Sequence, residues 1–128
     1  MKTIDIGNLG EKLAAKYLKK QGYRIIAKNA KLSYNELDLI ALVDNDIVFV
    51  EVKARSVSDD LYSSYGSPAS AVTKSKQSHL LAGAGQYLRA HPKYAARQPR
   101  FDVVEVYLDK ETHKPLQIHH IQNAFGRH

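Results

Sequence analysis

The feature that most constrains this fold is a pair of apolar segments, 36–43 and 47–54, that flank the triplet Asp44-Asn45-Asp46. Both segments are rich in Val, Ile, Leu and Phe, which favour strands, whereas Asp and Asn favour turns. The pattern therefore predicts a β-hairpin. Because the apolar residues do not alternate strictly with polar ones, we expect both faces of the hairpin to be covered, as in the centre of an α/β sheet.

A helix is expected before the hairpin. Asn8 is a good N-cap residue, and Glu11 three positions later completes a capping-box pattern. Apolar residues at helical spacing follow, and Gly22 is expected to end the helix.

The remaining elements complete an α/β fold. A strand is expected at 23–28, and a second helix at 73–90 with Thr73 as its cap. Strands are expected at 101–108 and 116–121. The helical link between the third and fourth strands favours a parallel, right-handed crossover. The order α-β-β-β-α-β-β thus predicts a mixed sheet flanked by helices.

Length and composition limit the class of protein. The 128 residues suit a single domain, 1–128. The chain has no Cys, which excludes a disulfide framework, thiolate catalysis and a Cys-ligated zinc site. No apolar run is long enough to span a membrane, and the first residues do not resemble a secretory signal. We therefore expect a cytoplasmic protein that does not associate with membranes.

The charge is unevenly distributed along the chain. Nineteen Lys and Arg against thirteen Asp and Glu give a net charge of +6. Segment 1–35 holds eight basic and two acidic residues, and 74–100 holds six basic and none acidic, whereas 36–60 holds two basic and seven acidic. The basic segments indicate a polyanionic partner such as nucleic acid. The alternative is that these Lys and Arg only solvate helix faces.

The hairpin brings acidic residues together. A turn of two or four residues places Asp38 opposite Glu51 and Glu36 opposite Lys53, whereas an odd loop would turn Asp38 to the other face. Because residues two apart share a face of a strand, Glu51 and Lys53 project together.

Directly opposed carboxylates destabilise a sheet unless a cation lies between them. Mg²⁺ or Mn²⁺ would fill that role, with Asp38, Glu51 and the carbonyl of Val52 as ligands. Such an ion would activate a water and polarise a phosphodiester, and Lys53 would neutralise developing charge. The alternative is a salt bridge between Glu36 and Lys53, with Asp38 and Glu51 solvated.

These residues also carry a family resemblance. Asn-Glu-Leu-Asp-Leu-Ile at 35–40, followed by Val-Phe-Val-Glu-Val-Lys-Ala-Arg at 48–55, resembles the PD-(D/E)xK nuclease signature. The chain is also similar to the YraN-like family of small bacterial proteins (UPF0102), which resembles archaeal Holliday-junction resolvases. Further matching pieces are Gly-Asn-Leu-Gly-Glu at 7–11, Tyr-Gly-Ser-Pro-Ala-Ser-Ala-Val at 65–72, Lys76-Gln77, and Arg-Phe-Asp-Val at 100–103.

The resemblance implies a restriction-endonuclease-like α-β-β-β-α-β core. It makes Asp38, Glu51 and Lys53 the catalytic trio and adds Glu11 as a helix-borne acid. The implied metal ligands are then Asp38, Glu51, Val52 and Glu11. For Glu11, the capping box remains an equal alternative.

Two functions follow from these patterns. The first is a Mg²⁺- or Mn²⁺-dependent endonuclease acting on DNA, with selectivity for branched or junction structures. The second is a nucleic-acid-binding module of the same fold that does not cleave. The resolvase-like relatives suggest a homodimer. In either case the expected nucleic-acid contacts are Arg55, Lys74, Lys76 and Gln77.

Overall fold

The computed structural model describes residues 5–32, 35–57 and 72–125. Apart from Val72, the motif at 65–72 lies outside the described residues. The elements are α1 (Ile6–Lys20), β1 (Arg24–Lys31), β2 (Glu36–Val43), β3 (Asp46–Val57), α2 (Lys74–Ala90), the 3₁₀ turn η3 (Pro92–Tyr94), β4 (Gln98–Asp109) and β5 (Pro115–Phe125).

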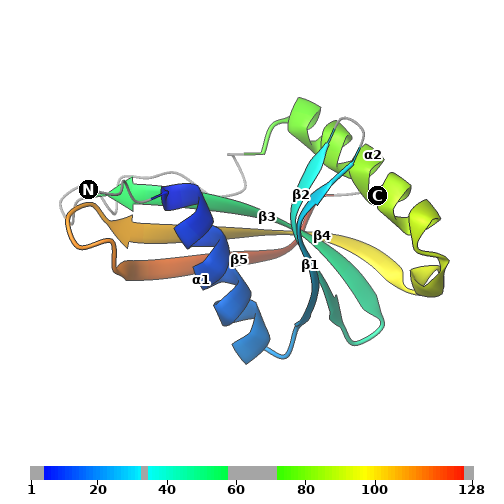
Figure 1. The fold of residues 1–128 in the computed structure, drawn as a ribbon, viewed down its shortest axis with the longest axis horizontal. Coiled ribbons are helices and arrows are strands. Elements are labelled where there is room, and N and C mark those ends of the chain that lie inside the picture. Colours follow the sequence, from blue (N-terminus) through cyan, green and yellow to red (C-terminus); the bar gives the residue numbers. More distant parts are fainter. Residues whose placement is uncertain (1–4, 33–34, 58–71, 126–128) are drawn as a thin grey trace.

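The strands form one mixed sheet in the order β1-β2-β3-β4-β5 (Figure 1). β3 and β4 are parallel and are connected through α2, while the other neighbouring pairs are antiparallel. The predicted α/β class and the parallel crossover are confirmed, and the arrangement matches a restriction-endonuclease-like core. In the described part of the chain, every helix falls short of the length and apolar character that a membrane crossing requires.

Each helix covers one side of the sheet (Figure 1). The core under α1 includes Leu18, Leu39 and Val48, and the core under α2 includes Phe49 and Leu80. Because β2 and β3 contribute buried residues to both cores, the predicted covering of the hairpin on both faces is confirmed. The two cores therefore hold the central strands β2 and β3 rigidly from both faces of the sheet.

The start of α1 differs from the prediction. Asp5, not Asn8, is the N-cap, and its Oδ1 accepts a hydrogen bond from the Asn8 backbone N–H at 3.1 Å. Both residue types cap well, and packing of Ile6 and Leu9 against the core extends the helix by a turn. The predicted end is confirmed, since Gly22 follows the C-cap with a φ of +93°.

Gly10 sets how closely α1 approaches the sheet. A Cβ atom at this position would lie 2.6 Å from the Cβ of Ala54 in β3. Two carbon atoms do not approach so closely in real proteins, so a side chain at this position would force the backbone to shift. The absence of a side chain at Gly10 therefore lets α1 dock directly onto the strand that carries Glu51 and Lys53.

We expect Gly10→Ala to lower the free energy of unfolding by about 1–3 kcal/mol, because the added methyl overpacks the contact with Ala54. Gly85→Ala is the matched control. Its Cβ would meet only the flexible end of Arg89, so the better helix propensity should raise stability by about 0.5–1 kcal/mol. Urea unfolding of both variants measures the difference. Equal effects would show that α1 is not closely docked.

Candidate active site

The site forms where β2 and β3 stop pairing. The predicted register is confirmed from Val43 opposite Asp46 to Leu39 opposite Val50. At the next position the Asp38 side chain takes the place of a backbone partner. Its Oδ2 accepts a hydrogen bond from the Val52 N–H at 2.9 Å. Asp38 is thereby fixed against the backbone of the strand that carries Glu51.

Glu51 lies next to two lysines. Its side chain is only 5% exposed, and its Oε1 lies 3.3 Å from Lys53 Nζ and 3.8 Å from Lys76 Nζ. Its Oε2 is buried and has no hydrogen-bond partner among the residues that the structure describes. Lys53 thus pairs with Glu51, and the alternative of a salt bridge to Glu36 is wrong. The reason is that β2 and β3 separate before Glu36 and Lys53 could face each other.

The Glu51 carboxylate disfavours the charged form of Asp38 at the centre of the site. Burial, and then the neighbouring Glu51 carboxylate, raise the pKa of Asp38 to about 7, and Glu11 adds to the increase. The Val52 N–H and Lys76 act in the opposite direction. Asp38 and Glu51 therefore form a site in which a cation would relieve an electrostatic cost.

A cavity of about 360 Å³ opens beside Asp38. Glu11 lines it, and burial followed by the nearby Glu36 carboxylate raises the pKa of Glu11. Because Asp5 caps α1, the capping-box alternative for Glu11 is wrong, and its carboxylate is left facing the cavity. The lining residues are Glu11, Asn35, Glu36, Asp38, Lys76, His79 and Leu80.

The acids are less tightly grouped than the resemblance implies. Among residues 5–32, 35–57 and 72–125, no three His, Asp or Glu side chains lie close enough together to hold a metal ion. Glu11 is therefore not gathered with Asp38 and Glu51 into one set of ligands. Mg²⁺ needs only one or two carboxylates, with waters completing its shell. The unpartnered Oε2 of Glu51 and its repulsion of Asp38 fit such an ion.

Comparison with known proteins identifies the family. A model described as "Uncharacterised protein family UPF0102" matches residues 10–106. The chain belongs to the UPF0102 family. A UPF0102 protein of Caldanaerobacter subterraneus is 45% identical over 120 residues, which cover 94% of this chain and 93% of that relative. One from Syntrophomonas wolfei is 41% identical over 121 residues, which cover 94% and 97%.

The four residues of this UPF0102 protein that were predicted to contact nucleic acid lie in different surroundings. Arg55 lies two residues beyond Lys53 and forms an ion pair with Glu105. Lys76 reaches Glu51, as described above. Gln77 instead donates its side-chain N–H to the Val72 carbonyl at 3.0 Å, which secures the start of α2. Lys74 is exposed and does not line the cavity.

Sequence reasoning missed two parts of the UPF0102 structure. His79 lines the cavity three residues after Lys76, and helical spacing alone would have placed it on the same face. The second is Asp102, which is fully buried between Arg100 and His120. Although burial opposes it, hydrogen bonds from His120, Arg100 and the Asn123 backbone lower the pKa of Asp102. Through these hydrogen bonds, the Asp102 carboxylate holds β4 and β5 together.

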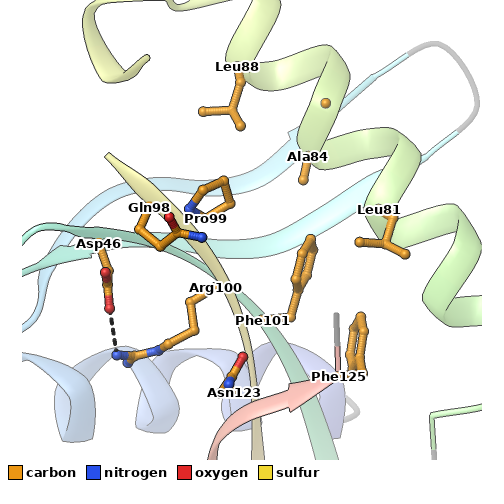
Figure 2. A pocket seen from close by; sticks show the side chains of 11 residues that line it. Asp46, Leu81, Ala84, Leu88, Gln98, Pro99, Arg100, Phe101, Asn123 and Phe125 are labelled. Carbon is orange, nitrogen blue, oxygen red and sulfur yellow. Dashed lines mark hydrogen bonds and ion pairs between the residues drawn. The ribbon is translucent and has the colours of Figure 1, made fainter. Parts of the chain in front are cut away.

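A second cavity, of about 640 Å³, lies between α2 and β4 (Figure 2). Its wall includes the apolar side chains of Leu81 and Phe125, and its charged groups are Asp46 and Arg100. These two groups are paired with each other at 3.1 Å. Among the lining residues that the structure describes, no acid or base is left unpaired. The cavity beside Asp38 is therefore the better candidate for the active site of this UPF0102 protein.

Proposed function

We propose that this UPF0102 protein is a cytoplasmic nuclease that hydrolyses DNA phosphodiester bonds with Mg²⁺ or Mn²⁺. The observation that carries the proposal is the buried Glu51 carboxylate, which lies beside Asp38 and Lys53 and has one oxygen without a hydrogen-bond partner within residues 5–32, 35–57 and 72–125. A buried carboxylate oxygen without a hydrogen-bond partner is costly, and it is typical of a site that receives a cation.

The residues that would hold the metal are Asp38 and Glu51, together with the carbonyl of Val52. When bound, the ion supplies Lewis-acid chemistry at a phosphodiester. Lys53 lies 3.3 Å from Glu51, so its ammonium is oriented by that carboxylate. There it neutralises charge that develops on the phosphate oxygens while water attacks phosphorus and one P–O ester bond breaks.

Lys76 and the basic face of α1 supply the electrostatic attraction for DNA. Lys76 comes from α2 and already reaches the site. Lys12, Lys16, Lys19 and Lys20 are exposed along α1. These side chains would contact phosphates without reading bases, so we expect binding that falls steeply with salt and selectivity for DNA structure, such as branches or junctions.

A non-catalytic nucleic-acid-binding module is the second candidate. One observation favours it: Glu51 already has two lysine partners, Lys53 and Lys76, which offset its charge without a metal. Both candidates predict DNA binding and differ only in cleavage.

The test is to incubate the purified protein with branched, flapped, single-stranded and duplex DNA in Mg²⁺, Mn²⁺ or EDTA. We expect cleavage of at least one DNA structure with a divalent metal and none in EDTA. Cleavage that persists in EDTA would exclude the proposed site. Binding of DNA with no cleavage in any metal would instead favour the binding module.

A further inference from the structure

A second charged pair lies directly beyond the candidate active site. Glu51, Lys53 and Arg55 alternate along β3, so their side chains share one face of the sheet. Glu105 of the parallel strand β4 is aligned with Lys53 in the register. Its Oε1 lies 3.7 Å from Arg55 Nε. The proposed catalytic lysine therefore lies between Glu51 and the Arg55–Glu105 pair.

This pair has not closed into a hydrogen-bonded salt bridge. A charge-assisted bond between guanidinium and carboxylate is about 2.7–2.9 Å long and is often bidentate. Here Glu105 is 1% exposed, and both its Oε2 and Arg55 Nε are buried with no hydrogen-bond partner in the described part of the chain. A pair that served stability alone would satisfy these atoms, because an unsatisfied buried charge is strongly destabilising.

The geometry leaves Arg55 available to an anion. Its side chain is 39% exposed although its Nε faces the buried carboxylate. Arg55 also lies one strand repeat, about 6.5–7 Å, beyond Lys53 on the same face. A planar guanidinium in this position suits a phosphate diester, which it can bind through two nitrogens.

We propose that Arg55 binds a phosphate next to the scissile one, and that Glu105 is the positioning residue that holds Arg55 in place for it. This inference rests on the proposed function, because it takes Lys53 to mark the scissile phosphate. Glu105 lies under Arg55 and acts through it, without contacting DNA.

The test uses a DNA that the protein binds, with a single phosphate replaced by an uncharged methylphosphonate at each position in turn. Binding is measured in EDTA. For the wild type we expect the replacement to weaken binding at several positions, and roughly tenfold at the one next to the scissile phosphate. Arg55→Gln should weaken binding of unmodified DNA roughly tenfold and lose the sensitivity at that position. Glu105→Gln should do the same to a smaller extent.

Arg24→Gln is the matched control, since Arg24 is an exposed arginine on β1, opposite Leu42 and away from Glu51. It should keep the wild-type pattern. If Glu105→Gln does not fold, Glu105→Met replaces the carboxylate with an apolar chain of similar length. In turnover with Mg²⁺, Glu105→Gln should raise KM by less than roughly tenfold with kcat nearly unchanged, an effect that lost folding alone would not produce.

The inference is overturned if Arg55→Gln keeps the wild-type pattern of methylphosphonate sensitivity, or if the Glu105 variants change kcat and leave that pattern intact. Because binding is measured in EDTA, it does not depend on cleavage. Absence of cleavage would therefore count against the nuclease alone, and an unchanged binding pattern in an active enzyme would count against the Arg55 subsite alone.

Discussion

Lys53→Ala is expected to lower the rate of DNA cleavage by roughly 10²–10³-fold, with a change in DNA affinity of less than about tenfold. The ammonium of Lys53 is held 3.3 Å from the buried Glu51 carboxylate. A charge fixed in this way acts mainly on charge that develops in the transition state, so its loss should appear in kcat. Single-turnover cleavage and binding in EDTA separate the two effects.

Lys16→Ala is the control for this prediction, because Lys16 is an exposed lysine on α1 outside the cavity lining. It should reduce affinity slightly and leave kcat unchanged. Thermal unfolding of both variants checks that the fold persists. Full activity of Lys53→Ala would exclude Lys53 from the mechanism. It would also exclude the assignment of Glu51 and Lys53 to a PD-(D/E)xK signature.

Asp38→Asn should make the metal-free protein more stable at pH 8, by about 2 kcal/mol, while removing divalent metal binding. Burial and Glu51 raise the pKa of Asp38 to about 7. The folded state therefore holds this proton more tightly than the unfolded state, and wild-type stability falls as pH rises from about 4 to about 7. Asn carries no charge and can still accept the hydrogen bond from Val52.

The gain should consequently be largest above pH 7 and vanish near pH 4. Thermal unfolding in EDTA at several pH values measures it, with an expected rise in Tm of roughly 5–10 °C at pH 8. Calorimetry with Mn²⁺ tests the loss of metal binding. Glu111→Gln, which removes an exposed acid in the turn between β4 and β5, should change neither property. A variant less stable than wild type at pH 8 would contradict the proposed repulsion.

Local sequence patterns were sufficient to predict the main elements. The apolar segments around Asp44 and Asn45 fixed the hairpin and its register, and Thr73 capped α2 as expected. The N-cap of α1 was misjudged because Asp5 and Asn8 are equally suitable, and only packing against the sheet distinguishes them. These predictions succeed where neighbours in sequence are also neighbours in space.

The candidate site was predicted only in part, because its remaining contacts come from distant segments. Asp38, Glu51 and Lys53 belong to one hairpin, so periodicity was enough to bring them near each other. The approach of Lys76 depends on how α2 crosses the sheet, and that of Glu105 depends on the parallel register of β4. The position where β2 leaves β3 is likewise set by tertiary packing, and it decided that Glu36 does not reach Lys53.

The bond from the Val52 N–H to Asp38 gives the site its own spectroscopic reporter. This amide proton points at a carboxylate whose charge changes near neutral pH or on binding of a cation. In a ¹⁵N-labelled sample its resonance should shift when Mg²⁺ is added and should titrate with Asp38. One backbone signal would thus follow occupancy of the site directly, with no need for a substrate.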